Sequence, residues 1–444
     1  MKLNQFDTYS GICIIEENFS YSYKDLTTQI QKYSQELVGK IQKGDVICIK
    51  SDYSFHCIAL LLALAQKACI IVPIVPTTDS EFQNKVSAAS VGKIITFNKS
   101  FLEFEKQTFS GGTSYENYEI ITTQGNCGLV LFSSGTTGTP KVMVHDFTNL
   151  IEKFEKPKKT RNLNFLLFLL FDHIGGINTL LNCLNSGAEI TIPLNRNPEY
   201  ILNLIQEKKV QILPTTPTFL NLMLMTENFD KYDLSSLKMI TYGTERMPQA
   251  LLDKVKGKIP HVKFLQTFGT SETGIMKTES KSSTSLFFKI VDPDYEHKII
   301  HGQLYLKSKT QVKGYVNHEN NQFKEDGWFA TGDLVETDND GFIKIIGRIN
   351  NIINVGGQKV LPKEVEDIIS TIPEILDVTV YAKKSIITGE MICADIVIKE
   401  GLDKDLIKNR IMQKCRSELD KYKVPSKISI SNSLTFSSRF KKTK

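Results

Sequence analysis

Three short apolar runs in this chain each end in a polar, glycine-containing loop, and this pattern constrains the fold more than any other feature. GLVLF precedes SSGTTGTPK, LKMI precedes TYGTERMP, and VKFLQ precedes TFGTSETG. Such runs are typical of buried strands, and helical stretches alternate with them over the first two thirds of the chain. Because ligand-binding loops of open α/β sheets gather at the carboxyl ends of the strands, we expect the three loops to converge on one crevice.

The last part of the chain has a different pattern. Strands are predicted at 303–308, 342–346, 377–382 and 391–398, and helices at 361–370 and 403–422. Pro362 at a first-turn position favours the start of the earlier helix. From Ile349 onward these elements predict a separate α+β domain of ordinary size, with the polar pair Asn350-Asn351 as its joint. The expected domains are therefore 1–348 and 349–444.

Composition excludes several classes of protein. Of 444 residues, 41% are apolar and 23% are charged, which is typical of a globular chain rather than a disordered or fibrous one. A net charge of +5 over this length is too small for the basic stripe of a nucleic-acid binder. The longest apolar stretch, Ile58–Pro76, is interrupted at Gln66 and Lys67, and neither half is long enough to span a membrane. We therefore expect no nucleic-acid or membrane partner.

We expect no signal peptide in the first residues, because no apolar segment follows a basic start. The eight cysteines are scattered singly without a CxxC pair, so neither a zinc site nor a disulfide scaffold is indicated. Both features favour a cytoplasmic setting.

The segment Ser133–Lys141 has the strongest chemical pattern. Its hydroxyl and glycine residues after an apolar strand offer N–H and O–H donors with little bulk, and its lysine adds a positive charge. This composition suits a polyphosphate, although it does not match the Walker A pattern. From composition alone, a flexible Gly/Thr turn is an equal alternative.

This nonamer closely resembles the phosphate-binding signature of the adenylate-forming (AMP-binding) superfamily. The superfamily comprises acyl- and aryl-CoA synthetases, adenylation domains of nonribosomal peptide synthetases, and luciferases. Further segments resemble its motifs in the same order, and the resemblance covers nearly the whole chain. It implies an α/β fold: a large N-terminal domain of stacked mixed sheets with helices and a small β-barrel-like part, and a small α+β C-terminal domain.

The resemblance assigns nucleotide contacts to most of these motifs. The phosphate loop supplies Ser133, Ser134, Gly135, Thr136, Thr137, Gly138 and Lys141. The adenine pocket and α-phosphate contacts are implied for Gly243, Thr244, Glu245, Phe268, Gly269, Thr270 and Ser271. Glu272 is implied to hold Mg²⁺, Asp333 to accept hydrogen bonds from ribose, and Arg348 to reach ribose or phosphate. Gly356 and Gly357 resemble the loop that swings in for the second half-reaction.

The segment FDHIGG resembles the family's acyl-pocket motif and places His173 next to the reacting carboxylate. A buried structural histidine is the alternative reading. Asp172 is unusual before that histidine. Its register is one position early for binding an amino-acid ammonium, so we expect a solvated or structural aspartate. Phe165 and Phe168 are expected in the sheet core rather than in the substrate wall.

The end of the chain departs from the family pattern. Asn350 stands where the hinge is usually Asp or Lys, and Phe440 replaces a glycine in the last motif. Spacing assigns the catalytic lysine to Lys441. The alternative is a frayed basic tail, because three of the last four residues are lysines.

The resemblance therefore implies an ATP- and Mg²⁺-dependent acid–thiol ligase. A small-molecule carboxylic acid would become an acyl-adenylate with release of pyrophosphate, and would then pass to a thiol, with CoA as the favoured acceptor. Lys441, His173 and Glu272 are the expected catalytic residues. Two alternatives remain open: a free-standing adenylation protein that loads a carrier-protein phosphopantetheine, and a nucleotide-binding pseudoenzyme. Pyrophosphate exchange would separate the pseudoenzyme from the enzymes.

Overall fold

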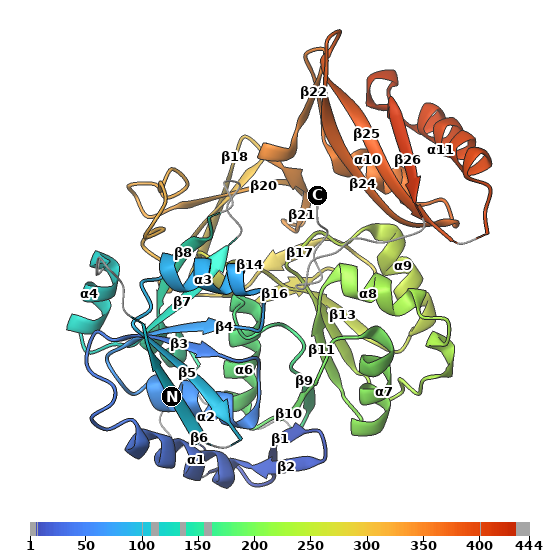
Figure 1. Cartoon of the computed structure of the whole chain (residues 1–444). Coiled ribbons are helices and arrows are strands. Elements are labelled where there is room, and N and C mark those ends of the chain that lie inside the picture. The colour runs from blue at the N-terminus through green and yellow to red at the C-terminus, as the bar shows by residue number, and fades with distance from the viewer. Residues whose placement is uncertain are drawn as a thin grey trace.

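The structure is a computed structural model that describes residues 6, 8–99, 101–107, 115–133, 139–154, 162–399 and 401–431. Within these residues, three sheets of six or seven strands and the helices around them form a large lobe. A fourth sheet, with helices α10 (Pro362–Ser370) and α11 (Lys404–Glu418), forms a small lobe at the C-terminal end of the chain (Figure 1). This is the mixed α/β architecture predicted from the sequence.

The first sheet of the large lobe has the described strand order β6-β5-β3-β4-β7-β8. Its four inner strands are parallel, and both edge strands are antiparallel to their neighbours. The strands are β3 (Val46–Lys50), β4 (Ile70–Ile74), β5 (Lys93–Asn98), β6 (Phe101–Lys106), β7 (Gly128–Ser133) and β8 (Lys141–Asp146). Helices α3 (Asp79–Ala88) and α4 (Glu116–Thr123) contribute to the apolar cluster on one face of this sheet.

The second sheet has the order β13-β12-β11-β9-β10-β1-β2, in which every pair except β1 with β2 is parallel. The strands are β1 (Ile12–Glu16), β2 (Phe19–Ser22), β9 (Asn164–Leu166), β10 (Glu189–Ile192), β11 (Ile212–Thr215), β12 (Met239–Tyr242) and β13 (Lys263–Gln266). Three helices pack on one face of it: α7 (Pro198–Lys208), α8 (Pro217–Met225) and α9 (Gln249–Lys258).

The largest apolar core lies between these two sheets and contains α2 (Phe55–Leu64) and α6 (Ile174–Ser186). Nine of the ten residues of α2 are buried, and the helix is apolar on every side. A helix of this kind requires packing all around it, which a position between two sheets supplies. Helix α1 (Tyr23–Glu36) packs against α2, and the short helix α5 (Phe147–Glu152) adds to the same core.

The third sheet is antiparallel throughout and has the order β16-β17-β21-β20-β19-β18. The strands are β16 (Thr278–Ser280), β17 (Phe288–Ile290), β18 (Tyr295–Ile300), β19 (Gln303–Ser308), β20 (Phe329–Thr337) and β21 (Ile343–Arg348). A separate hairpin of β14 (Phe268–Thr270) and β15 (Gly274–Met276) precedes it. The strands predicted at 303–308 and 342–346 are therefore found here.

The small lobe is built on the strand order β23-β22-β25-β24, with β26 parallel to β25. The strands are β22 (Ile353–Val355), β23 (Gln358–Val360), β24 (Ile375–Ser385), β25 (Gly389–Ile398) and β26 (Lys427–Ser431). A 3₁₀ turn, Ile349–Asn351, joins β21 to β22 and contains the predicted joint. The predicted helix at 403–422 ends earlier, at Glu418.

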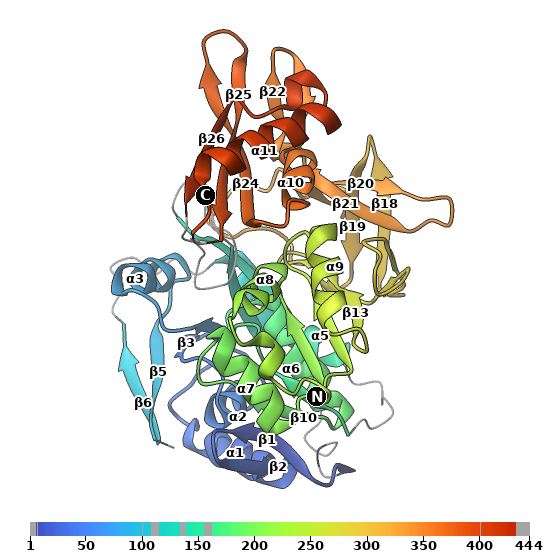
Figure 2. The ribbon, with the colours of Figure 1, turned by 90° about the vertical axis from the view of Figure 1, so that its right-hand side faces the viewer.

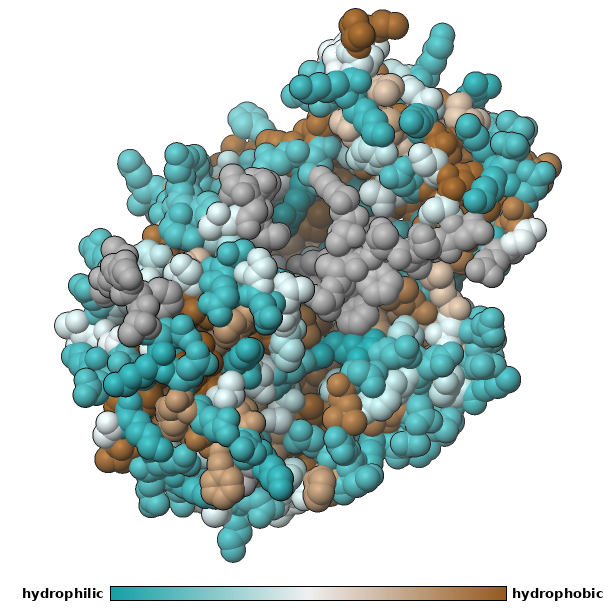
Figure 3. Space-filling view, in the orientation of Figure 1, coloured by the Kyte–Doolittle hydropathy of each residue, from teal (hydrophilic) through white to brown (hydrophobic). Residues whose placement is uncertain are grey.

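The small lobe touches the large lobe through α10, which lies next to α9 (Figure 2). Arg246 of the large lobe forms a two-pronged ion pair with Asp367 of α10, and the Asn221 side chain donates to the Leu376 carbonyl at 2.9 Å. The visible surface is hollowed between the two lobes (Figure 3). All eight cysteines are buried in the two lobes and have free thiols.

Candidate active site

A cavity of about 430 Å³ lies where the three predicted strand-end loops meet. Ser133 ends β7, Gly243 and Thr244 follow β12, and the segment 267–272 follows β13. The predicted convergence is therefore found. The lining contains these sequence-predicted residues: Ser133, Lys141, His173, Gly243, Thr244, Phe268, Gly269, Thr270, Ser271, Glu272 and Arg348.

Other predicted residues lie elsewhere. Glu245, Asp333, Gly356 and Gly357 are not among the residues that line the cavity. The predicted residues Ser134, Gly135, Thr136, Thr137, Gly138 and Lys441 lie outside the described residues. Their proposed roles stay predictions.

Glu272 is held by a tyrosine that sequence reasoning missed. The Tyr315 hydroxyl donates to Glu272 Oε1 at 2.6 Å, and the Lys141 ammonium lies 4.7 Å from the centroid of the Tyr315 ring. Burial, together with the Glu272 charge, raises the pKa of Tyr315, so its hydroxyl stays protonated and remains a donor. Tyr315 therefore connects the lysine of the phosphate loop to the carboxylate predicted to hold metal.

The residues at this point fit a magnesium ion that arrives with a nucleotide. No group of three or more His, Cys, Asp or Glu side chains within the described part of the chain could hold a metal alone. Mg²⁺ commonly binds through one or two carboxylates together with substrate phosphates, rather than in an all-protein cage. Glu272 supplies one such carboxylate in the cavity, close to Lys141.

His173 begins α6 as its N-cap residue, and its Nδ1 accepts from the Gly175 N–H at 3.0 Å. With Nδ1 accepting, the neutral imidazole carries its proton on Nε2. A side chain at Gly176 would collide with the Leu170 carbonyl oxygen at 2.2 Å. The glycine therefore allows the helix to start against the preceding loop, and this local packing holds His173 at the cavity.

Asp172 is a buried, structural residue, so the solvated alternative is wrong. Its side chain is 0% exposed and lies 3.5 Å from the Lys85 ammonium, which is itself buried. Lys85 belongs to α3, so the pair ties that helix to the loop before α6. Buried charges occur mostly in such pairs, because an isolated one costs several kcal/mol. Asp172 does not line the cavity.

Arg348, at the end of β21, reaches the cavity and donates through Nε to Asp333 at 2.9 Å. Burial of Asp333 raises the pKa of its carboxyl, and Arg348 opposes this change. The two residues pair directly across β20 and β21, so the sheet register brings the two separate motifs together.

The glycines of the nucleotide motifs are required by close packing. A side chain at Gly243 would meet the Thr267 hydroxyl at 2.5 Å, and one at Gly269 would meet the Gly274 carbonyl at 2.3 Å. Between them, Thr244 has a φ of +70°, a strained backbone for a β-branched residue. Strain of this kind is concentrated at functional sites.

Glu245 has a structural role in this conformation. Its carboxylate accepts from the Thr218 N–H at 2.7 Å, in the first turn of α8. An acidic group at a helix N-terminus is favoured by the helix dipole and by the unpaired N–H groups there.

The opposite end of the cavity contains residues that sequence reasoning did not find. They come from α6, β9, β11 and β12, and include Asn178, Thr179, Asn182, Ile212, Pro214, Thr215 and Thr241. Phe165 is buried in the sheet, as predicted, but it also lines the cavity. The prediction that Phe165 lies in the sheet core rather than in the substrate wall was therefore wrong on the second point. No short motif joins these residues, and only the fold brings them together.

Solved structures share this fold. An anthranilate CoA ligase in complex with anthranoyl-AMP superposes with a TM-score of 0.82 at 18% identity, over 98% of this chain and 94% of that one. An o-succinylbenzoate CoA synthetase from Bacillus subtilis gives 0.76 at 19% identity, over 99% and 96% of the two chains. The fold is that of adenylate-forming enzymes, as predicted.

Sequence comparison identifies the family. Residues 7–316 match the AMP-binding enzyme family, and residues 364–441 match the AMP-binding enzyme C-terminal domain. The chain belongs to the AMP-binding enzyme family, and the resemblance drawn from its motifs is confirmed.

Curated relatives of the chain are CoA ligases. A 4-coumarate–CoA ligase of Humulus lupulus is 27% identical over 443 residues, which cover 87% of this chain and 80% of the relative. The 4-coumarate–CoA ligase 1 of Arabidopsis thaliana is 28% identical over 334 residues, or 68% and 59% of the two chains.

None of the described helices combines the length and the apolar character that crossing a membrane requires.

Proposed function

We propose that this chain is an ATP-dependent acid–CoA ligase of the AMP-forming kind. One observation carries the proposal: a cation, a carboxylate and a histidine from separate motifs, Lys141, Glu272 and His173, line one cavity. The CoA ligases among its relatives support CoA as the acceptor.

In the first step, a carboxylate oxygen of the acid attacks the α-phosphorus of ATP. A P–O bond forms, the bond to pyrophosphate breaks, and an acyl-adenylate results. Lys141 is positioned to oppose the negative charge that builds on the phosphates, and Tyr315 holds Glu272 in place. Mg²⁺, when bound at Glu272, supplies further positive charge to the phosphates. Lys441 is proposed to add a cation to this step.

In the second step, a thiol sulfur attacks the acyl carbon, the thioester forms and AMP leaves. We place the joint for the accompanying movement at Asn350, between units 1–348 and 349–444. Movement is required for Gly356 and Gly357 to take part, because their β22–β23 turn does not line the cavity in this conformation. Such gating allows one cavity to serve two reactions.

The test is ATP–pyrophosphate exchange with a panel of aliphatic, aryl and amino acids, followed by addition of CoA or a carrier protein. Glu272→Gln should reduce exchange by roughly 100- to 1,000-fold, the usual effect of removing one electrostatic contact to the transition state. The matched control is Glu279→Gln on β16, an exposed site outside the cavity. Equal rates in both variants would refute the metal role of Glu272.

The two alternatives give different results. A pseudoenzyme would bind ATP without exchange. A carrier-loading protein would exchange with acid but form a thioester only with phosphopantetheine attached to a carrier. The buried pair of Asp172 with Lys85 favours a plain carboxylic acid over an amino acid, because that aspartate is engaged outside the cavity.

A further inference from the structure

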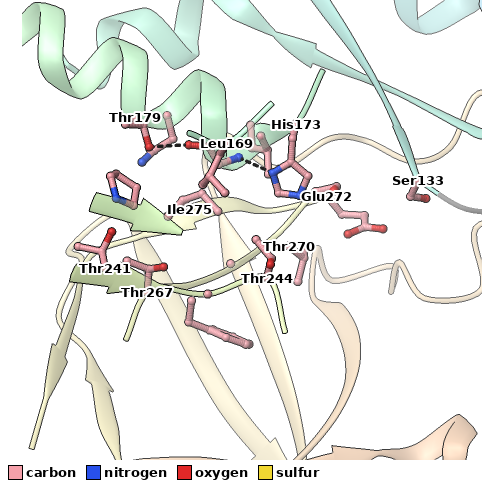
Figure 4. Close-up of a pocket in the computed structure, with 18 of the residues that line it drawn as sticks. Ser133, Leu169, His173, Thr179, Thr241, Thr244, Thr267, Thr270, Glu272 and Ile275 are labelled. Atoms are coloured by element: carbon pink, nitrogen blue, oxygen red, sulfur yellow. Dashed lines mark hydrogen bonds between the residues drawn. The ribbon is translucent and has the colours of Figure 1, made fainter. Parts of the chain in front are cut away.

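The cavity has two chemically different ends. Ser133 and Glu272 lie at one end, Thr179, Thr241 and Thr267 lie at the other, and His173 lies between them (Figure 4). Under the proposed function the first end takes the nucleotide phosphates, and the second is left for the body of the acid.

One wall of the acid end is a face of α6. Gly175, Asn178, Thr179 and Asn182 all line the cavity, and their spacing places them on one side of the helix. From Gly175 to Asn182 this face extends roughly 10 Å, at about 1.5 Å per residue. The acid end is therefore deep enough for a chain of several carbons or for one aromatic ring.

The described residues that line this end are uncharged and of mixed polarity. Asparagine and threonine side chains alternate with the apolar residues Leu169, Ile212 and Ile275. Among the described lining residues, the charged groups are Lys141, Glu272 and Arg348. They belong to the phosphate loop, the loop after β13 and the end of β21, not to the α6 face.

One hydroxyl at this end is without a partner. Thr215 ends β11, is 1% exposed and lines the cavity, and its Oγ1 makes no hydrogen bond within the described structure. Two neighbouring threonines are satisfied: Thr179 Oγ1 donates to the Gly175 carbonyl at 2.8 Å, and Thr267 Oγ1 to the Tyr242 carbonyl at 3.1 Å. Buried hydroxyls are almost always paired, so an unpaired one at a cavity wall points to a missing ligand.

We infer that the acid end selects a neutral, hydroxylated carboxylic acid, with its hydroxyl at the end remote from the carboxylate. The inference rests on the proposed function and adds the substrate class to it. A hydroxyl both donates and accepts, which complements the threonine hydroxyls and asparagine amides. An unsubstituted alkyl chain would leave the Thr215 hydroxyl unpaired, and a terminal charge would find no counter-charge among the described residues of this end.

The experiment compares four acids of the same length: 6-hydroxyhexanoate, hexanoate, adipate and 6-aminohexanoate. A second pair, 3-(4-hydroxyphenyl)propanoate and 3-phenylpropanoate, tests an aromatic body. Pyrophosphate exchange gives kcat/KM for each acid. In at least one series, the hydroxylated member should exceed its unsubstituted partner by at least tenfold, and the charged acids should be the poorest.

Variants locate the effect. Thr215→Val should reduce the preference for the hydroxylated acid to about threefold or less, because kcat/KM should fall more for the hydroxylated acid than for its unsubstituted partner. Thr215→Ser keeps the hydroxyl and should keep the preference. Asn178→Leu should shift selectivity in the same direction as Thr215→Val. Because Thr215→Val removes an unpaired hydroxyl, it should unfold at no lower temperature than the wild type.

Two results would overturn the inference while leaving the proposed function intact: preference for the unsubstituted or charged acids, or a Thr215→Val effect that is equal for all acids. Absence of exchange with every acid, while ATP still binds, would instead overturn the proposed function and the inference with it.

Discussion

Tyr315→Phe is the most direct test of how the site holds its metal. The change removes one hydroxyl oxygen and leaves the ring that Lys141 contacts. The lost bond is a short one, 2.6 Å, to a carboxylate, and hydrogen bonds to charged groups contribute about 1.5–3 kcal/mol. At about 1.4 kcal/mol per factor of ten, this is roughly a 10- to 150-fold effect.

Groups that orient a metal ligand commonly change metal affinity by about 10- to 100-fold, so the two estimates agree. The Mg²⁺ concentration for half-maximal pyrophosphate exchange should therefore rise by about that factor. Calorimetry should show weaker binding of Mg·ATP, while binding of ATP without Mg²⁺ changes little.

The matched control is Tyr305→Phe on β19, which removes a tyrosine hydroxyl that bonds only to Gln303 in the described structure. Tyr315→Phe should have little further effect in a Glu272→Gln background, because the hydroxyl is expected to act through that carboxylate. If Tyr315→Phe leaves the Mg²⁺ dependence unchanged, the hydroxyl does not position Glu272, and the reasoning fails.

Three further predictions concern stability and the small lobe. Burial lowers the pKa of His145 to about 4, whereas an unfolded chain protonates this imidazole near pH ~6.5. Between these two pH values the unfolded chain binds a proton at His145 and the folded chain does not. The free energy of unfolding should therefore fall with falling pH, by up to about 1.4 kcal/mol per pH unit. His145→Gln should reduce this pH dependence, as measured by urea unfolding at pH 7 and pH 5. Asp172→Asn removes one charge partner of the buried Lys85 ammonium, which keeps Glu81 at 2.7 Å, and should cost up to about 3 kcal/mol of unfolding free energy. A loss below about 0.5 kcal/mol would contradict a structural pair. Asp367→Asn weakens the ion pair with Arg246 between the lobes, so limited proteolysis at the joint should become faster. An unchanged cleavage rate would show that this ion pair does not hold the small lobe against the large one.

Much of the fold could be predicted from the sequence because its signals are local. The three apolar runs became β7, β12 and β13, and their loops met at one cavity. Pro362 begins α10, as its preference for a first-turn position indicated. Motifs of contiguous residues also placed His173 and Glu272 at the cavity.

The remaining features depend on contacts between distant segments. Nothing in the residues around Asp172 indicates that Lys85 of α3 would pair with it, and nothing around Tyr315 indicates its bond to Glu272. The acid end is assembled from one face of α6 and residues of the three strands β9, β11 and β12. Its residue types can be read from the sequence, but their common cavity requires the packing of α6 against the second sheet.

The burial of all eight cysteines makes the folded enzyme nearly inert to thiol reagents. Thiols react as thiolates, and burial raises the pKa of Cys48 to about 12 and of Cys415 to about 11. A disulfide reagent would therefore report the consumption of free CoA with little background from the protein. Cysteines introduced at the exposed positions Leu194 and Leu406, one on each lobe, could be labelled without removing any native thiol. A fluorescent pair there would test the proposed movement of the small lobe between the two half-reactions.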